Sequence, residues 1–487
     1  MLKGECSVSV KCPRKANMMD IFKYSLGEGS FSIAMNGANS FSLIFLTQIL
    51  GLNPAWASLS ISISILWDAI TDPLMGHISD NTRSRWGRRH QYILAGGWVT
   101  AIFFFMFWSI PQLFTTPVLI FTAALVINLL IKTAITVYTV PYTALGFEIC
   151  PEYESRARVQ GTRYFISQMT NFIFVAGAWS LFFRDRIDDN GMRIDGSLIA
   201  SNYILMGAVL AVFIIVLVTI CAVGTRRYAV DNRGDVLHGN NLKAFWKDFS
   251  SVFKDRLAVF VFIFFAIAQF AIMLMGQVQM FTYIFFMQFS AIEKTCVHGG
   301  GMLAFALASL SLPKVVKRLD KKPTGYLAMG LAFSGGMGLL AVFTGGLLVP
   351  QQQLNFSGVT IPVATIVFGL LQMCWWGGCG LLVPLVSSMV ADVAAINYAK
   401  TGELKNASYA SIFSFCTKAM QSVGMLICGS LVHFAGIISG AAQQSPEAIR
   451  NISIMTFVNG PVVMILALLI LRKYPVTRET MNQLEMK

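Results

Sequence analysis

Twelve apolar stretches, each of about twenty residues or more, alternate with polar segments along the chain. A stretch of this length crosses the hydrocarbon core of a bilayer as an α-helix, so each one predicts a membrane-spanning helix. The predicted spans are 28–49, 56–79, 91–110, 117–147, 162–183, 199–224, 257–281, 292–316, 325–349, 359–388, 407–435 and 451–471. The sequence therefore predicts an all-α membrane protein with twelve transmembrane helices in two six-helix bundles.

The spans divide the chain into two halves around a polar, basic segment. The expected parts are a cytoplasmic N-terminal segment 1–27, a bundle 28–224, a cytoplasmic linker 225–256, a second bundle 257–471 and a cytoplasmic tail 472–487. In the linker, Phe245, Phe249 and Phe253 are four residues apart, which indicates either a short helix on the membrane surface or a plain tether. Two such halves are typical of a secondary transporter with a central site between them.

Composition and charge support this picture and add an orientation. Hydrophobic residues make up 55% of the chain and charged residues only 13%, which excludes a disordered chain and a soluble enzyme. Of the 37 lysines and arginines, two, Lys132 and Lys418, lie deep within spans, and only five lie in the alternate loops or at the span ends beside them, namely Arg184, Arg186, Arg193, Lys294 and Arg450. The positive-inside rule then places both termini in the cytoplasm. We expect a plasma membrane location, the bacterial inner membrane above all.

The sequence offers no catalytic machinery. It has five histidines and no HExxH, GxSxG or GxxxxGK[ST] motif, and its nine cysteines form no CxxC pair. We therefore expect no enzymatic activity and no cofactor other than a coupling ion.

Two aspartates, Asp68 and Asp72, lie within the second predicted span, where ionisable groups are costly and often functional. Residues four apart share one helix face, so the two carboxylates repel each other unless a cation or a proton joins them. Thr71 beside them and Thr136 in the fourth span supply the neutral oxygens that sodium prefers. The pattern predicts an Na⁺ or H⁺ site, or alternatively a carboxylate pair that is salt-bridged to other helices.

Three basic residues also lie in or beside spans. Lys132 stands one turn before Thr136 and could replace a metal cation at the aspartates, or could form a structural ion pair. Arg163 and Lys418 balance the charges of the two aspartates if all four meet in one cavity. We treat Lys132 as a possible modulator of the ion site.

Three stretches, 67–94, 139–165 and 391–424, resemble the glycoside–pentoside–hexuronide:cation symporters, the melibiose-carrier family of the major facilitator superfamily. The resemblance implies the major facilitator fold and alternating access. It places a cation site on Asp68, Thr71, Asp72 and Thr136, and basic sugar-pocket residues on Arg163 and Lys418. Ser32, Thr139 and Thr143 stand where melibiose carriers have two aspartates and a tryptophan.

The loss of those acids makes the predicted cavity more positive, so an anionic sugar, such as a uronide or a sulfonated sugar, becomes a candidate substrate beside a neutral glycoside. A lysophospholipid symporter and a non-transporting membrane sensor are the alternatives. The expected partners are a small-molecule substrate and the lipid bilayer. We expect no nucleic acid, and we expect a monomer.

Two further groups of residues complete the predicted site. The loop after the second span resembles the superfamily's gate motif, with Asp80, Arg83, Arg88 and Arg89 as gating residues, although these arginines could simply anchor the loop at the cytoplasmic surface. Asp392, after the tenth span, joins them by resemblance. Trp375 and Trp376 could stack on a sugar or pack against lipid.

Overall fold

The computed structural model describes residues 17–80, 82, 84, 87, 89–149, 153–187, 191, 193–228, 252–356, 359–401, 406–441 and 443–480. The first half contains α1 (Met18–Ile44) with η1 (Phe45–Ile49), α2 (Pro54–Asp80), α3 (His90–Trp108) with α4 (Ile110–Leu113), α5 (Pro117–Ile149), α6 (Tyr153–Thr170) with η2 (Asn171–Ala176) and α7 (Ala178–Leu181), and α8 (Ala200–Gly224). The second half contains α10 (Arg256–Phe281) with η5 (Thr282–Phe286), α11 (Ala291–Leu319), α12 (Lys321–Leu339) with η6 (Leu340–Thr344), α13 (Val363–Thr401), α14 (Asn406–Phe434) and α15 (Pro446–Leu471).

These elements form twelve long helical segments within the described residues, six in each half, as predicted. Nine of them are long and apolar enough to cross a membrane by length and composition. The other three segments, α1, α2 and α6 with η2 and α7, carry more small polar or charged residues, which lowers their hydropathy. The predicted surface helix of the linker falls mainly on residues outside the described ranges.

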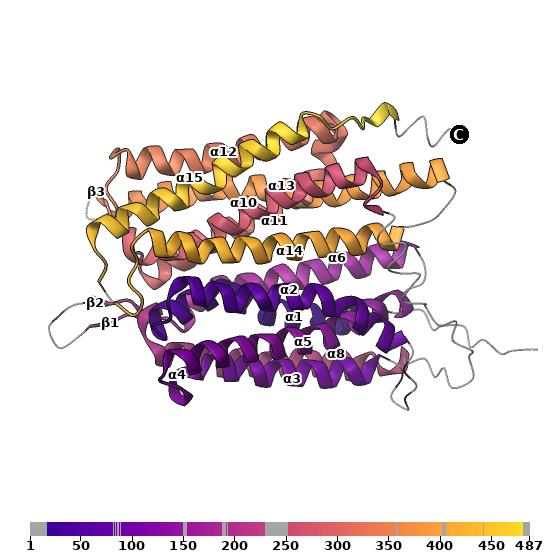
Figure 1. Cartoon of the computed structure of the whole chain (residues 1–487), viewed down its shortest axis with the longest axis horizontal. Helices are drawn as coiled ribbons and strands as arrows, with labels where there is room; N and C mark the ends of the chain where they lie inside the picture. Colours follow the sequence, from indigo (N-terminus) through magenta and orange to yellow (C-terminus); the bar gives the residue numbers. More distant parts are fainter. Residues whose placement is uncertain are drawn as a thin grey trace, which may run out of the picture.

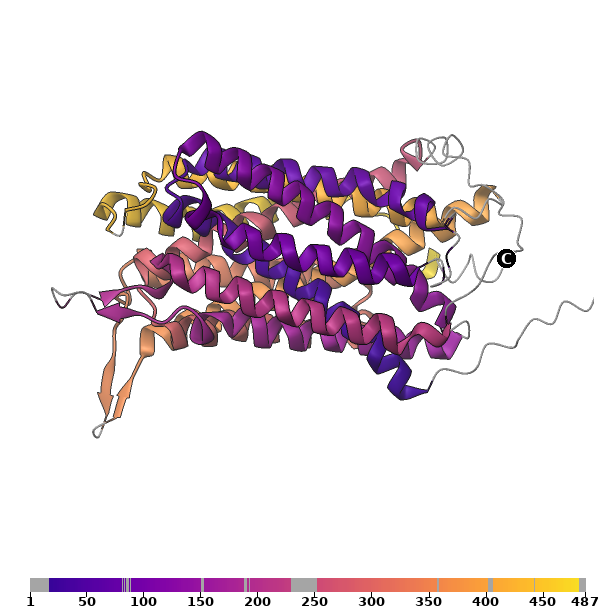
Figure 2. The same ribbon diagram turned by 90° about the horizontal axis from the view of Figure 1, so that it is seen from below.

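The helices lie side by side along the long axis of the molecule, with the first half below the second in Figure 1. Two short hairpins mark one end, here called the hairpin end: β1 (Arg186–Ile187) pairs with β2 (Arg193–Ile194), and β3 (Leu354–Phe356) pairs with β4 (Val359–Ile361). At the opposite end, here called the termini end, α1 begins and α15 ends (Figure 2). Positive charge predicts that the termini end is cytoplasmic.

Helix α1 begins ten residues before the predicted span. Asn17 and Asp20 form a reciprocal capping box, in which each side chain accepts a hydrogen bond from the other residue's backbone amide. The helix therefore starts in the polar segment and continues through the membrane-spanning part without a break. This extension brings Glu28 into the bundle.

The two halves meet along α2 and α14, which lie against each other (Figure 1). The Ser62 hydroxyl donates to the backbone oxygen of Ser422 at 2.8 Å. A Cβ at Gly429 would lie 2.0 Å from Ser58 Oγ, so only glycine allows this approach. Close contact of small residues is the usual way in which helices associate within a bilayer.

Candidate functional site

A cavity of about 390 Å³ lies where α1, α2, α5, α6 and α14 meet. Its wall contains half of the residues that the sequence nominated for ion and substrate binding. The nominated residues on the wall are Asp68, Asp72, Thr139, Thr143, Arg163 and Lys418. We call this space the charged cavity.

The two aspartates of α2 share one basic partner from the other half. Lys418 Nζ lies 2.8 Å from Asp68 Oδ2 and 2.5 Å from Asp72 Oδ2. Asp68 is only 2% exposed, whereas the Asp72 side chain is 31% exposed. An ammonium therefore lies between the carboxylates, at the position that the sequence assigned to a coupling cation.

The neutral oxygens lie beside the same carboxylates. Thr136 Oγ1, on α5, is 2.9 Å from Asp68 Oδ1 and 3.1 Å from Asp72 Oδ1, and it lies 3.3 Å from Thr71 Oγ1. A hydroxyl carries one proton, so Thr136 can donate to only one carboxylate at a time. The cluster thus has spare acceptor oxygens that a small cation can use.

Lys132 lies on the same helix but does not join the aspartates. Its side chain is buried, and Nζ donates to Met35 Sδ at 2.8 Å. Within the described ranges it forms no ion pair. A thioether is a weak acceptor, so this ammonium is poorly satisfied in this conformation.

Arg163 has a partner that the sequence analysis missed. Its guanidinium makes two hydrogen bonds to Glu28 Oε2, at 2.9 Å from Nε and 2.6 Å from Nη2. Its Cζ lies 4.9 Å from the centre of the Tyr142 ring, a cation–π contact. Glu28 stands one turn before Ser32 on α1, so this half of the cavity keeps an acid, displaced by one helical turn.

The remaining nominated residues lie in different surroundings. Ser32 is buried and shares a 2.6 Å hydrogen bond with Ser167, away from the cavity wall. Trp375 is fully buried in the second half, where Gly335 and Gly460 approach it closely, so it is a packing residue in this conformation. Its neighbour Trp376 lines a second cavity, described below.

The nominated gating residues are only partly described. Asp392, on α13, forms an ion pair of 2.5 Å with Lys321 at the start of α12. Arg89 is buried at the start of α3. Arg83, Arg88 and the side chain of Asp80 lie outside the described residues, so their gating role remains a prediction.

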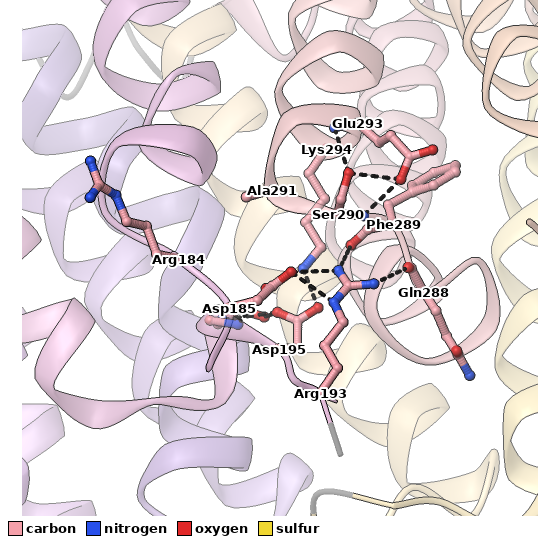
Figure 3. A network of polar contacts seen from close by, with 12 residues as sticks. Arg184, Asp185, Arg193, Asp195, Gln288, Phe289, Ser290, Ala291, Glu293 and Lys294 are labelled. Atoms are coloured by element: carbon pink, nitrogen blue, oxygen red, sulfur yellow. Dashed lines mark hydrogen bonds and ion pairs between the residues drawn. The ribbon is translucent and has the colours of Figure 1, made fainter. Parts of the chain in front are cut away.

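At the hairpin end, polar contacts join the two halves (Figure 3). Asp195 of the first half pairs with Lys294 of α11. Arg193 pairs with Asp185 at 2.7 Å and also donates to the backbone oxygen of Phe289 in the second half at 3.1 Å. These contacts close the bundle at the hairpin end, away from the charged cavity.

The Asp195 carboxylate is held in its ionised form. Burial by itself would raise its pKa, but the charge of Lys294 and hydrogen bonds from Ser197 outweigh burial and hold the pKa below its ordinary value. The Asp195 carboxylate is therefore charged at neutral pH and can pair with Lys294.

Comparison with solved structures shows the fold. The crystal structure of the nucleoside transporter NupG matches with a TM-score of 0.59 at 14% identity, over 94% of this chain and 100% of that one. A bacterial homologue of the human drug peptide transporters PepT1 and PepT2 matches with a TM-score of 0.62 at 12% identity, over 96% and 100% of the two chains. The predicted major facilitator fold is confirmed.

Comparison with curated sequences finds symporters. The chain is 34% identical over 151 residues to the uncharacterized symporter sll1374 of Synechocystis, and 28% identical over 144 residues to the inner membrane symporter YicJ of Escherichia coli. These matches cover 30% of this chain each, and 28% and 31% of those proteins. Two longer matches each have 23% identity. The isoprimeverose transporter of Lactiplantibacillus pentosus matches over 91% of this chain and 85% of that protein. The sodium-dependent lysophosphatidylcholine symporter 1-A of Danio rerio matches over 94% of this chain and 85% of that protein.

The family match covers nearly the whole chain. Residues 23–478 match the family described as MFS/sugar transport protein, which includes all twelve helical segments except the first turn of α1. The resemblance seen in the motifs of α2, α5–α6 and α13–α14 is thereby confirmed. This chain belongs to the MFS/sugar transport protein family.

Proposed function

We propose that the protein is a cation-coupled symporter that carries a sugar or glycoside by alternating access. The observation that carries this proposal is the ammonium of Lys418 between Asp68 and Asp72. Ammonium and coupling cation use the same carboxylates, so binding of one opposes binding of the other. A cation that enters the pair releases Lys418 toward the charged cavity, whose wall it lines.

This exchange couples ion and substrate. The released ammonium can donate hydrogen bonds to a hydroxyl or an anionic group in the cavity. Substrate that binds Lys418 in turn keeps it away from the aspartates and favours the cation. The two affinities must rise by the same factor, because binding linkage is reciprocal.

The exchange also couples binding to movement of the halves. Lys418 belongs to the second half and the aspartates to the first, so their ion pair ties α14 to α2. Removing one partner of a buried ion pair costs about 3–5 kcal/mol. This ion pair is therefore a substantial part of the barrier to movement of the two halves relative to each other. Cation and substrate together replace the contacts between Lys418 and the aspartates and allow the halves to rock.

The charge balance of the cavity bears on the substrate. Glu28, Asp68 and Asp72 now oppose Arg163, Lys418 and the nearby Lys132, so acids and bases are equal in number. An excess of bases would favour an anionic sugar, and Glu28 removes that excess. A neutral glycoside, whose hydroxyls both donate and accept, suits a wall of paired acid and base.

The coupling ion follows from the oxygens at the pair. Across the described ranges, no three His, Cys, Asp or Glu side chains converge as a metal site. Two carboxylates and the hydroxyls of Thr71 and Thr136 are hard oxygen ligands, which suit Na⁺. A proton on one carboxylate would also remove their mutual repulsion, so H⁺ is the other coupling ion to test.

The remaining features of the proposal concern placement. We propose that the protein works as a monomer in a bacterial inner membrane, with both termini cytoplasmic, and that it transports without catalysis. The lysophosphatidylcholine symporter of Danio rerio matches this chain over about the same length as the isoprimeverose transporter does, so a lysophospholipid is the second substrate class to test. The sodium dependence in that relative's name agrees with the oxygen ligands.

Uptake into proteoliposomes tests the proposal. Purified protein is supplied with neutral glycosides, acidic glycosides and lysophosphatidylcholine under separate Na⁺ and H⁺ gradients. The proposal predicts accumulation of at least one glycoside above its outside concentration, driven by one of the gradients. Substrate that only equilibrates under both gradients would show a facilitator, and accumulation of the lipid alone would select the second class.

A further inference from the structure

A second cavity, of about 340 Å³, lies between the halves and carries no Asp, Glu, Lys or Arg on its described wall. It is bordered by α1, α6 and η2 of the first half and by α10, α11, α13 and α14 of the second. Side-chain amides dominate its polar surface. They include Asn36, Asn39, Asn171, Gln269, Gln277 and Gln279. We call this space the amide cavity.

Several polar atoms on this wall have no partner among the described residues. Both ring nitrogens of His298, which is 7% exposed, are unpaired, as is Nε2 of Gln279, which is 2% exposed. Oε1 of Gln269 is in the same state. Each buried polar group left without a hydrogen bond costs about 1–3 kcal/mol, so a cluster of them indicates a ligand that supplies the missing bonds.

The amide cavity lies beside the charged cavity, on its hairpin-end side. Met35 lines the charged cavity and the next residue of α1, Asn36, lines the amide cavity. On α14, Lys418 lines the first and Gln421, one turn further, lines the second. The two cavities therefore lie about one helical turn, or roughly 5 Å, apart along the bundle, a separation that two linked sugar rings can span.

The wall also offers flat apolar surfaces. Trp376 and Phe172 both line the amide cavity. A Cβ at Gly301 would lie 2.7 Å from Trp376 Cδ1, so glycine at this position lets the indole lie against α11. Aromatic faces beside amides match a sugar ring, which has apolar C–H faces and hydroxyls around its edge.

We propose that the amide cavity binds a neutral, polyhydroxylated ring: the second sugar unit of a disaccharide or glycoside whose first unit occupies the charged cavity. This inference rests on the proposed transport of a glycoside and specifies its size. An acyl chain in the same space would leave His298 and the amides without partners. The absence of charged groups on the described wall likewise disfavours an anionic ring.

Binding of matched sugars tests the inference. The probes are isoprimeverose with xylose, and melibiose with galactose, measured by calorimetry on purified protein and by uptake into liposomes. The variants are Gln279→Leu and His298→Phe. The matched control is Gln48→Leu, because Gln48 in η1 is also buried with both amide atoms unpaired, but lines neither cavity.

Each cavity variant is expected to weaken disaccharide binding about tenfold, the equivalent of one hydrogen bond of about 1.4 kcal/mol, and to leave the monosaccharide unchanged. The unchanged monosaccharide also shows that a variant is folded, and Gln279→Met replaces Gln279→Leu if the latter misfolds. Equal disaccharide affinity in variants and wild type, or equal losses for both sugars, would overturn the inference while the proposed transport stands. A wild type that accumulates no probe sugar would overturn both.

Discussion

Replacing Lys418 with methionine should strengthen Na⁺ binding at the aspartates. In the wild type, the ammonium occupies the pair with contacts of 2.8 Å to Asp68 and 2.5 Å to Asp72. Methionine keeps most of the side-chain volume and removes the charge. The carboxylates then face each other with only the hydroxyl of Thr136 between them.

The size of the effect follows from their separation. Both carboxylates contact Thr136 Oγ1, at 2.9 and 3.1 Å, so those two oxygens lie no more than about 6 Å apart. At an effective dielectric constant of about 20, two negative charges at about 6 Å repel by about 3 kcal/mol. A cation that relieves this repulsion, and no longer competes with Lys418, should bind about 100-fold more tightly.

Isothermal titration of purified protein with NaCl at pH 8, with choline chloride as the ionic-strength control, measures this affinity. Lys132→Met is the matched control, since it removes a buried ammonium that contacts Met35 and not the aspartates. We expect it to change Na⁺ affinity less than threefold. Unchanged or weaker Na⁺ binding in Lys418→Met would refute the competition between ammonium and cation.

Four further variants probe the aspartate pair, the charge of the cavity and the hairpin end. Asp68→Asn and Asp72→Asn should each abolish accumulation in liposomes while substrate exchange survives, and concentrative uptake by both would exclude these residues from coupling. Glu28→Gln leaves the Arg163 side of the cavity with excess positive charge, so the ratio of the affinity for acidic glycosides to that for neutral glycosides should rise about tenfold. Competition binding measures this ratio, and a constant ratio would show that Glu28 does not set the charge of the cavity. Asp195→Asn should open the hairpin end, which would be measured as a longer distance between spin labels on β1 and β3. The wild type should stay closed from pH 8 to about 5, because a lowered pKa keeps the Asp195 carboxyl charged until the pH falls below the ordinary value of about 3.9. Opening of the wild type near pH 6 would contradict this.

Much of the fold could be predicted because it depends on local composition. Twelve apolar stretches became twelve helical segments, since each must satisfy its own backbone hydrogen bonds in the bilayer. The meeting of Asp68, Asp72 and Thr136 was also predictable from helix periodicity and the family motif. Lys418 was nominated as a substrate residue, and its contact with both aspartates depends on how the two halves pack.

Glu28 was missed because hydropathy does not locate the start of the first helix. The predicted span began at residue 28 and left its acid at the membrane edge, whereas the Asn17 cap starts α1 at Met18 and carries Glu28 into the bundle. The signal that could have found it is its spacing, four residues before Ser32, on the face assigned to the site.

The amide cavity could not be predicted for a different reason. Its polar residues come from helices that are far apart in sequence, and each one alone is an ordinary uncharged side chain in an apolar stretch. Trp375 and Trp376 show the same difficulty, because adjacent residues of one helix point in different directions. Only the packing of α13 decides that Trp375 is buried and that Trp376 faces the cavity.

The most direct test of ion coupling is the affinity of the protein for its transported sugar, measured with and without Na⁺ and across a range of pH. The account predicts that one of the two cations lowers the sugar's Kd, and that saturating sugar lowers the Kd of that cation by the same factor. Asp72→Asn should remove this dependence. A wild-type Kd that is identical with and without Na⁺ at every pH would contradict the account.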